Sequence, residues 1–524
     1  MPRFKLFLAL SCLYLVTACD APAPEPSATV EDSPVTAEET VTAEKAGIDW
    51  FDGSVEEAFA LSKAENKPLF LYWGAVWCPP CVEIRSTVFK SQRFIAMTRL
   101  FVPVYLDGDT ERAQDWGDRF GTQVYPTMIV FNPQGEEVTR LNAGIDISAY
   151  NDVLETSLER MRPIRELART AIAAPNALSE AEYQQLAYYS WYDDKALPDN
   201  APPDFFLRLS DAAASKNPRA AARLYLQYAA VAGGEGQHVD PDRITAILST
   251  PELLFAAWDY LTGPEQILPA LAGDQARLDE LKPLWADTMR QQRTDERLTI
   301  KNRLYGWRPW LVFHFEGDPE KSRPLPEDVV EAIRADGAAA TASVAGTHAR
   351  QSVINALSNV YMLAGMTADA RALLTAEIEK SGTPYYFMGS LAYLEEQSGS
   401  PAVAVDWWQR AYEAAEGPAT RIRWWTRYVE ALTRLEPGAT AKILDVALYP
   451  FDPSQGMETL LSGANFRNLE RASAALRQWD GAYHSAQSAL GAFRKAIADY
   501  CGGVNAATEE SGRCDSLLSG EGSP

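Results

Sequence analysis

Hydrophobic and polar positions follow two different patterns along this chain. Between residues 47 and 162, short apolar runs typical of buried strands alternate with stretches of helical spacing. The predicted helices are Ser54–Asn66, Cys78–Met97, Thr110–Phe120 and Ile147–Met161, and the predicted strands are Leu69–Trp73, Leu100–Leu106, Thr127–Phe131 and Glu136–Leu141. This α-β-α-β-α-β-β-α order predicts an α/β domain over residues 47–162.

From residue 163 onward the pattern is helical. Segments rich in Ala, Leu, Glu and Arg are interrupted at Pro and Gly, and strand signals are few. The clearest predicted helices are Ile164–Ala174, Ser179–Tyr189, Pro218–Ala232, Arg243–Ala257, Glu327–Ala340 and Thr347–Leu363. We therefore predict an all-α region, divided into a helical domain at 163–345, a repeat region at 346–445, and C-terminal helices with a tail at 446–524.

A repeat with a period of 34 residues is visible in this region. Shifting the sequence by that period aligns Gly365 with Gly399 and Ala370 with Ala404. The period and its small residues resemble the tetratricopeptide repeat, in which stacked helical hairpins form a concave surface. Seven aromatic residues here either line a groove for a partner protein or form the core between repeats: Tyr385, Tyr386, Phe387, Trp407, Trp408, Trp424 and Trp425.

The N-terminal segment predicts export. A short basic stretch and an apolar run, too short for a typical transmembrane helix, lead to Val16-Thr17-Ala18-Cys19, so residues 1–19 are predicted to be a signal peptide. Its end resembles a bacterial lipobox, which implies a lipid on Cys19 and anchoring to a membrane in the periplasm. Asp20 favours the inner membrane by the same resemblance. The alternative is an ordinary signal peptide with an incidental cysteine.

Residues 20–46 are predicted to be a disordered tether, because they are rich in Ala, Pro, Glu and Thr and hold few large apolar groups.

The net charge of the chain limits which classes of binding partner are plausible. The chain has 48 Lys and Arg against 71 Asp and Glu, a net charge of −23. This argues against nucleic acid and against a basic surface for anionic lipid. The predicted link to a membrane is therefore the lipid on Cys19.

A pair of cysteines supplies the candidate chemistry. Trp77-Cys78-Pro79-Pro80-Cys81 follows a predicted strand and begins a predicted helix. A helix N-terminus stabilises a thiolate, so Cys78 is the predicted nucleophile, and the spacing lets Cys81 resolve the mixed disulfide. Pro79 and Pro80 stiffen the turn. Half of a zinc site is the alternative, but none of the four histidines has metal-ligand spacing to another. No metal or cofactor is predicted.

A proline at a strand entrance, in Val124-Tyr125-Pro126-Thr127, is the second signature, because proline cannot donate to a sheet ladder. Together with the cysteine turn it resembles the thioredoxin family, in particular the exported bacterial domains of periplasmic disulfide reductases and of membrane-tethered thioredoxins of the cytochrome-maturation type. The resemblance covers residues 47–162. It implies a thioredoxin fold, a cis proline against the cysteines, and substrate contacts from Trp77, Pro79, Pro80, Tyr125, Pro126 and Thr127. The alternative is a trans proline in an ordinary loop.

Two positions depart from the cytosolic members of that family. Tyr72 stands where those members have a buried aspartate, and Val82 replaces the usual basic residue after the second cysteine. Glu83 is the candidate proton acceptor if it turns inward, and it needs no role if it lies on the helix surface. These departures leave dithiol–disulfide exchange intact but leave the potential and the proton route open.

Cys501 and Cys514 form a second pair near the C-terminus. They are the cysteines that remain once Cys12 is removed with the signal peptide, Cys19 carries a lipid, and Cys78 pairs with Cys81. We predict a structural disulfide between them that pins the end of the chain. The alternative is a second redox pair that exchanges electrons with the first.

These features predict a membrane-tethered periplasmic thiol:disulfide oxidoreductase whose helical region docks its partner. The resemblance to reductases favours reduction of disulfides in exported proteins, and it implies an electron donor at the membrane. An interaction scaffold with a regulatory disulfide is the alternative from a different class. A disulfide-forming oxidase or isomerase would use the same residues.

Overall fold

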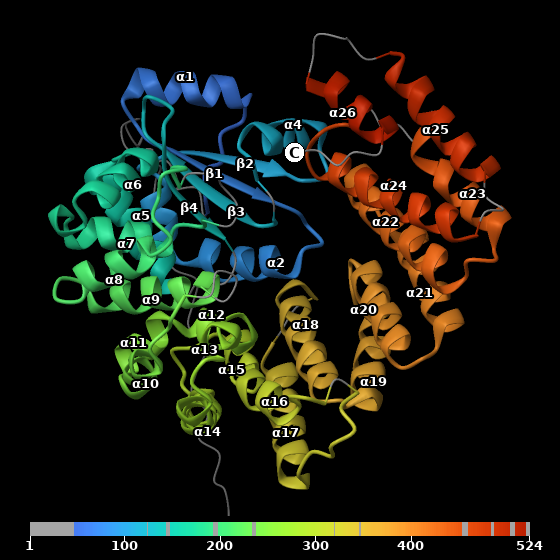
Figure 1. Cartoon of the computed structure of the whole chain (residues 1–524). Helices are drawn as coiled ribbons and strands as arrows, with labels where there is room; N and C mark the ends of the chain where they lie inside the picture. The colour runs from blue at the N-terminus through green and yellow to red at the C-terminus, as the bar shows by residue number, and fades with distance from the viewer. Residues whose placement is uncertain are drawn as a thin grey trace, which may run out of the picture. The chain divides into compact units, whose positions relative to one another are not determined.

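A computed structural model of the chain is shown in Figure 1. It describes residues 47–122, 124–142, 147–191, 197–232, 237–318, 320–344, 347–452, 460–483, 487–503 and 509–519. The predicted signal peptide, the lipidation site Cys19 and the tether at 20–46 lie outside these residues. Residues 47–524 group into one compact unit, so the α/β domain and the helical region are described together.

A four-stranded mixed sheet forms the centre of the α/β domain. Its strands are β1 (Leu69–Gly74), β2 (Val102–Asp107), β3 (Thr127–Phe131) and β4 (Glu137–Asn142), in the order β2-β1-β3-β4. β1 pairs parallel with β2 and antiparallel with β3, and β3 pairs antiparallel with β4. β1 is buried along its whole length, as a central strand covered on both faces should be.

Helices cover both faces of this sheet. α1 (Val55–Glu65) and α4 (Glu111–Arg119) pack on one face, where Leu71 and Trp73 of β1 point. α2 (Pro79–Ser86), α3 (Gln92–Thr98) and α5 (Ile147–Arg160) pack on the other, where Phe70 and Tyr72 point. The alternation along β1 is the two-residue period of a strand. In Figure 1, α1 lies above the sheet and α2 below it.

Two predicted helices are each interrupted. The expected helix Cys78–Met97 is divided into α2, a 3-10 turn at Val88–Lys90 and α3. Thr87 ends α2, since its hydroxyl donates to the carbonyl of Glu83 at 2.6 Å, and Ser91 caps α3 by accepting from Phe94. Such local side-chain bonds compete with helix continuation. The expected helix Arg243–Ala257 is divided into α10 (Pro241–Ser249) and α11 (Pro251–Ala256), because a proline removes an N–H and restricts the residue before it.

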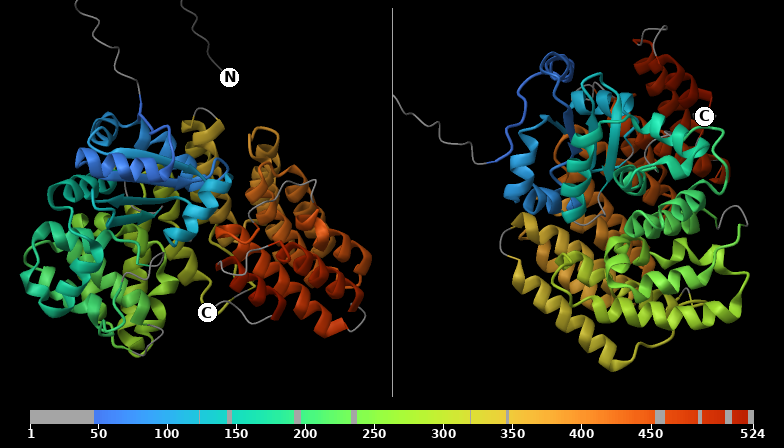
Figure 2. Two further views of the ribbon diagram at one scale, coloured as in Figure 1. Left: turned by 90° about the horizontal axis from the view of Figure 1, so that it is seen from above. Right: turned by 90° about the vertical axis from the view of Figure 1, so that its left-hand side faces the viewer.

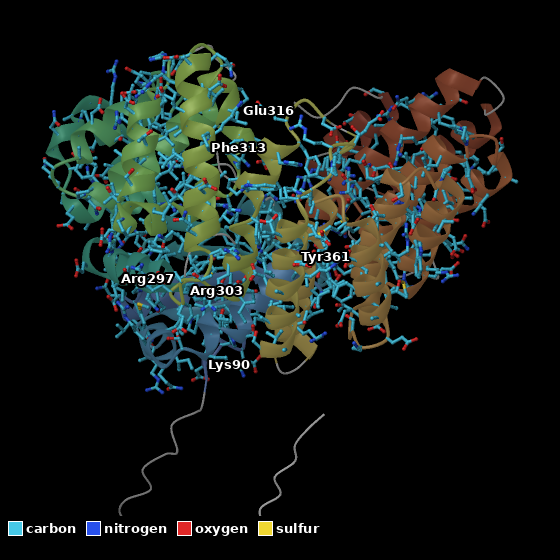
Figure 3. The ribbon with its side chains drawn as sticks, turned by 90° about the horizontal axis from the view of Figure 1, so that it is seen from below. Lys90, Arg297, Arg303, Phe313, Glu316 and Tyr361 are labelled. Atoms are coloured by element: carbon cyan, nitrogen blue, oxygen red, sulfur yellow. A yellow bond between two sulfur atoms is a disulfide. The ribbon has the colours of Figure 1, made fainter. Side chains whose placement is uncertain are left out.

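The chain continues as helices that lie beside the α/β domain (Figure 2). They are α6 (Ile164–Ala173), α7 (Glu180–Tyr188), α8 (Phe205–Ala213), α9 (Pro218–Ala232), α12 (Trp258–Leu261), α13 (Leu268–Leu271), α14 (Gln275–Gln292), α15 (Ile300–Tyr305), α16 (Arg308–His314) and α17 (Glu327–Ser343). Figure 3 labels Phe313 and Glu316, which contact Trp285 and Lys282 of α14. Within the described ranges, no helix combines the length and apolar character needed to cross a membrane.

The 34-residue period corresponds to two equivalent helical hairpins. α18 (Thr347–Leu363) pairs with α19 (Thr367–Ile378), and α20 (Pro384–Gln397) pairs with α21 (Pro401–Ala414). Gly365 and Gly399 take the same left-handed conformation between the helices, with φ of 68° and 73°. Ala370 and Ala404 are fully buried, which lets each pair approach closely. The assignment to the tetratricopeptide family itself stays a prediction.

The α-helices that the structure describes after α21 are α22 (Pro418–Leu435), α23 (Thr440–Leu448), α24 (Gly463–Tyr483), α25 (Gln487–Cys501) and α26 (Glu509–Ser519). α24 packs along α22, and α26 packs against both α24 and α25 (Figure 1). The predicted disulfide between Cys501 and Cys514 is present and joins α25 to α26.

Candidate active site

Cys78 and Cys81 lie at the turn that leads from β1 into α2. Cys78 is the N-cap residue of α2, and Pro79 and Pro80 occupy its first two positions, where an N–H would have no partner inside the helix. Both cysteines are free thiols. Cys78 exposes 4% of its surface and Cys81 exposes none. The backbone N–H of Ala75 donates to the Cys81 sulfur at 3.5 Å, which holds the second thiol against the end of the strand.

The cis-proline loop faces Cys78. The Tyr125–Pro126 peptide bond is cis, as the sequence predicts. The Cys78 thiol donates to the carbonyl oxygen of Tyr125, with a sulfur–oxygen distance of 3.5 Å. The Tyr125 ring stacks on Trp73 at 4.0 Å, and its hydroxyl accepts from the side-chain amide of Gln114 at 3.1 Å. Strand β1 and helix α4 thereby fix the carbonyl that stands beside the thiol.

The other predicted substrate contacts take different positions. Trp77 packs with both cysteines in one apolar cluster, and its ring meets the ring of Tyr125 edge-on at 5.7 Å. Thr127 is fully buried, and its hydroxyl donates to the carbonyl of Val124 at 2.8 Å. The buried side chain of Thr127 therefore stabilises the conformation of the cis-proline loop.

Burial controls the protonation of the groups behind Cys78. It raises the pKa of the Cys81 thiol well above its usual value; the hydrogen bond and charge of Cys78 raise this pKa further, and the N–H of Ala75 opposes the shift. Burial also raises the pKa of Tyr72, and the charges of Cys81 and Cys78 add to that rise. At neutral pH Tyr72 is a neutral phenol, so it cannot accept the Cys81 proton as the aspartate of cytosolic thioredoxins would.

Glu83 is engaged by a residue of the helical region. Its carboxylate forms an ion pair with Lys301 of α15, and the two side chains are only 14% and 17% exposed. Burial alone would lower the pKa of Lys301, but the carboxylate of Glu83 raises it overall, with smaller contributions from Tyr305 and Cys78. Lys301 therefore stays charged and brings a cation close to the cysteine pair.

Helices of the repeat region cover the cysteines. α18 lies beside α2, and Gln351 of α18 donates its side-chain amide to the backbone carbonyl of Trp77 at 2.7 Å (Figure 1). Tyr385 of α20 and Trp424 of α22 belong to the same buried cluster as Trp77, Cys78 and Cys81. A pocket of about 310 Å³ adjoins this contact, and Val76 and Gln351 are among its lining residues. The low exposure of Cys78 thus comes in part from the helical region.

The seven aromatic residues that the sequence singled out in the repeat region pack in more than one place. Tyr385 and Trp424 pack on the cysteine cluster, whereas Phe387 and Trp425 belong to cores between helices. Trp408 borders both kinds of cluster. Part of the aromatic surface is therefore occupied by the α/β domain of the same chain. The sequence suggested either a partner groove or an inter-repeat core, and this intramolecular contact is a third arrangement.

A second contact joins the domain to two parallel helices. Asp109, just after β2, accepts from the backbone N–H of Thr420 at 2.8 Å, in the first turn of α22. Asp118 accepts from the N–H of Gly463 at 2.6 Å, and Gln114 accepts from the N–H of Ala464 at 2.8 Å, at the start of α24. Acceptor groups at helix N-termini satisfy free N–H donors, and carboxylates there meet the positive end of the macrodipole.

Comparison with known proteins agrees with this geometry for one part of the chain. Residues 55–157 match the family model described as a thioredoxin-like domain. The chain therefore contains a thioredoxin-like domain with a mixed sheet, followed by a mostly helical region. Such a domain supports a thiol–disulfide oxidoreductase type of function in general terms. No curated protein matches the chain. Across the described residues, no group of three or more His, Cys, Asp or Glu side chains could hold a metal ion.

Sequence reasoning found the cysteine turn and the proline loop but missed Lys301, Gln351 and Arg423, whose guanidinium lies over the ring of Trp77. None of these three lies in a motif, and each reaches the site only through the packing of the helical region. Gln351 did carry a signal. It is a polar residue on the apolar side of a predicted helix, where Ile354 and Leu357 are also buried. A buried polar side chain requires a hydrogen-bond partner.

Proposed function

We propose that this protein is a periplasmic thiol–disulfide oxidoreductase, tethered to the membrane through a lipid on Cys19, that reduces disulfides of exported proteins. The observation that carries this proposal is the 3.5 Å contact between the Cys78 thiol and the Tyr125 carbonyl, with Cys81 behind the same turn. Nucleophile, resolving thiol and a backbone acceptor for a substrate peptide then share one site.

The reaction proceeds in two exchanges. Cys78 first releases its proton, and the resulting thiolate attacks one sulfur of the substrate disulfide, so a bond between Cys78 and that sulfur forms while the substrate bond breaks. The second substrate sulfur leaves as a thiolate and takes up a proton. Cys81 then releases its proton and attacks the Cys78 sulfur, which frees the first substrate thiolate, and this thiolate also takes up a proton. The substrate gains two electrons and two protons, the cysteine pair loses the same, and a dithiol donor at the membrane restores them.

In this proposal the helical region docks the partner and also controls access. Cys78 is 4% exposed beneath α18, α20 and α22, so a protein disulfide has to displace part of this cover to reach the sulfur. Docking of the partner on the helices supplies the binding energy for that displacement. The reducing direction follows the resemblance to reductases, and a disulfide-forming oxidase or isomerase would use the same atoms.

The burial of Cys78 also favours a second function, a scaffold in which the cysteine pair is a regulatory disulfide. A site closed by its own chain turns over slowly with external disulfides. In that case the helices bind the partner, and oxidation of the pair changes how tightly they hold the thioredoxin-like domain.

One experiment separates these functions. The reduction potential of the Cys78–Cys81 pair is titrated against defined glutathione or dithiothreitol ratios in the chain from residue 47, with a Cys501→Ser/Cys514→Ser background as control. A value near −270 mV, at the thioredoxin end of the range of about −270 to −120 mV, together with disulfide reductase activity that Cys78→Ser abolishes, supports the reductase. A value near −120 mV would assign an oxidase. Partner binding that survives in Cys78→Ser, without reductase activity in the native chain, would assign the scaffold.

A further inference from the structure

A group of arginines lies at the rim of the cis-proline loop and has no part in the exchange steps. Arg423 and Arg427 are one turn apart on α22, and Arg467 comes from the neighbouring α24. The guanidinium carbon of Arg423 lies 4.8 Å from the centre of the Trp77 ring. Arg467 donates to the backbone carbonyl of Thr122 at 3.3 Å. Arg423 and Arg467 therefore contact the two segments that frame the cysteines, the turn at Trp77 and the loop that ends at Pro126, and Arg427 lies one turn from Arg423.

The guanidinium of Arg423 has N–H donors without a partner among the described residues. Within that part of the chain its side chain forms no ion pair and no hydrogen bond. Its contact with Trp77 uses the flat face of the guanidinium, which leaves the N–H donors along the edge free. The ring also fixes the orientation of the guanidinium, so an incoming anion would meet a donor set that is already in place.

The carboxylates near these arginines are largely committed elsewhere. Arg427 reaches Glu430 at 3.5 Å, but Arg471 holds Glu430 more closely, at 2.7 Å. The carboxylate of Asp118, near Arg467, pairs with Arg513. Glu470, a further acidic neighbour of Arg467, accepts from the hydroxyl of Ser516 at 3.4 Å.

Burial lowers the pKa of Arg427; the charges of Arg471 and Arg423 lower it further, and the carboxylate of Glu430 opposes the shift. Burial likewise lowers the pKa of Arg467; Asp118 and Tyr125 oppose this shift, and the charge of Arg513 adds to it. In a chain with a net charge of −23, this is a locally positive surface beside the redox site. Arg427 is exposed, and Arg423 and Arg467 are half-buried, so solutes can reach these side chains.

We propose that Arg423, Arg427 and Arg467 form an anion-binding subsite that recognises a carboxylate carried close to the substrate disulfide. The inference rests on the proposed function and names a substrate class for it. Guanidinium groups bind carboxylates with two parallel, charge-assisted hydrogen bonds. The carboxylate belongs either to Asp or Glu beside a cysteine in a peptide or to a small anionic disulfide.

The test compares disulfide peptides that differ only in charge. Three cystine-bridged peptides carry Glu, Gln or Lys beside each cysteine, and each is mixed with the reduced protein in a stopped-flow fluorimeter that follows tryptophan emission. We expect the Glu peptide to oxidise the protein about tenfold faster than the Lys peptide at low ionic strength, with the ratio falling toward one as salt screens the charges. Glutathione disulfide as a fourth probe distinguishes a small anionic substrate from a peptide.

Arginine variants test whether the preference for the Glu peptide arises at this subsite. Arg423→Gln/Arg427→Gln should reduce the ratio of the Glu to the Lys rate to near one, and Arg423→Lys should keep most of it. The matched control is Arg434→Gln, farther along α22, where the arginine pairs with Glu396. If the double variant folds poorly, Arg467→Gln and the salt dependence of the native protein give the same comparison. Equal rates for the three peptides, or a preference that survives in the double variant, would overturn the subsite alone. Failure of every peptide to react would overturn the redox function as well.

Discussion

The side-chain amide of Gln351, in the helical region, donates to the backbone carbonyl of Trp77, the residue before the nucleophilic cysteine, at 2.7 Å. Both residues are buried. A carbonyl that is shielded from water requires a donor, and Gln351 supplies it from a segment far away in sequence. The conformation of the cysteine turn is therefore linked to the docking of α18 against α2.

Gln351→Ala should loosen this link. Removal of the donor leaves the Trp77 carbonyl buried without a partner, which costs about 1–3 kcal/mol of unfolding free energy. We expect iodoacetamide to alkylate Cys78 several times faster than in the native protein, because α18 no longer holds the turn closed. The control is Gln275→Ala, whose exposed amide donates to Asp279 on the same helix. A loss of stability with an unchanged alkylation rate would mean that the bond does not govern access.

Gly389→Ala should displace Trp424, one of the aromatic side chains that pack on the cysteines. A Cβ at this position of α20 would lie 2.2 Å from a ring atom of Trp424, which packs on the cysteine cluster. Overpacking of this kind costs about 1–3 kcal/mol and moves the ring. Gly491→Ala on α25 is the matched control, since its Cβ meets nothing within 4 Å and alanine favours the helix. Denaturant unfolding of both variants checks the prediction, and equal stabilities would contradict the close packing of α20 against Trp424.

The thioredoxin-like domain could be predicted almost completely from local patterns. β3 runs from Thr127 to Phe131 as expected, and the cis proline at 126 followed from its place beside the cysteine motif. Such features depend on residues close together in sequence or on a motif with a fixed geometry. The break at Thr87 was missed because apolar spacing continues through it, and the interruption depends on side-chain bonds of Thr87 to the Glu83 carbonyl and of Ser91 to the Phe94 N–H.

The cover of the site could not be predicted in this way. Trp424 and Trp425 are adjacent, so their side chains are about 100° apart around a helix and cannot share one face. This spacing does not tell which of the two meets the cysteines. Lys301 carries no motif, and its pairing with Glu83 depends on how α15 docks against α2. Contacts between distant segments are set by the sum of many packing interactions, and periodicity along one segment does not contain them.

The Glu83–Lys301 pair should behave as a coupled unit. Glu83→Gln or Lys301→Met alone leaves one charge buried without its counterion. Removing one partner of a fully buried pair costs about 3–5 kcal/mol, and the remaining exposure of these side chains reduces our expectation to about 2 kcal/mol. The double variant should lose less than the sum of the single losses. Urea unfolding of the four proteins in a double-mutant cycle measures the coupling, and strict additivity would show that the two charges do not interact.

Loss of the Cys501–Cys514 disulfide should destabilise the chain without changing its redox chemistry. The bridge closes a loop with a sequence separation of 13 residues. The chain-entropy model gives about 3 kcal/mol for a loop of this size. We expect Cys501→Ser/Cys514→Ser to unfold at lower denaturant concentration and to reduce disulfides at an unchanged rate under conditions where both proteins are folded. A reductase rate that falls with the bridge would favour the alternative of a second redox pair.

The raised pKa of Cys81 predicts how the reduced protein responds to alkaline pH. In the folded chain this thiol stays protonated well above the ordinary pKa of a cysteine, mainly because it is buried. Unfolding exposes the thiol and releases its proton once the pH exceeds the ordinary value. The contribution of this group is therefore complete below that value and is lost as the pH rises toward the folded-state pKa. The unfolding free energy of the reduced protein should decrease with pH over this interval.

Thiolate absorbance at 240 nm tests the same point directly. In Cys78→Ser, the remaining thiol of the pair should show no thiolate signal at pH 8, whereas the variant unfolded in urea should titrate near pH 8.5, about the value of a free cysteine. Cys78→Ser/Cys81→Ser provides the baseline for tyrosine ionisation. A thiolate signal below pH 8 in the folded single variant would show that a base near Cys81 accepts its proton. Since Tyr72 is neutral there, Glu83 would then be the group to test next, by Glu83→Gln in the same background.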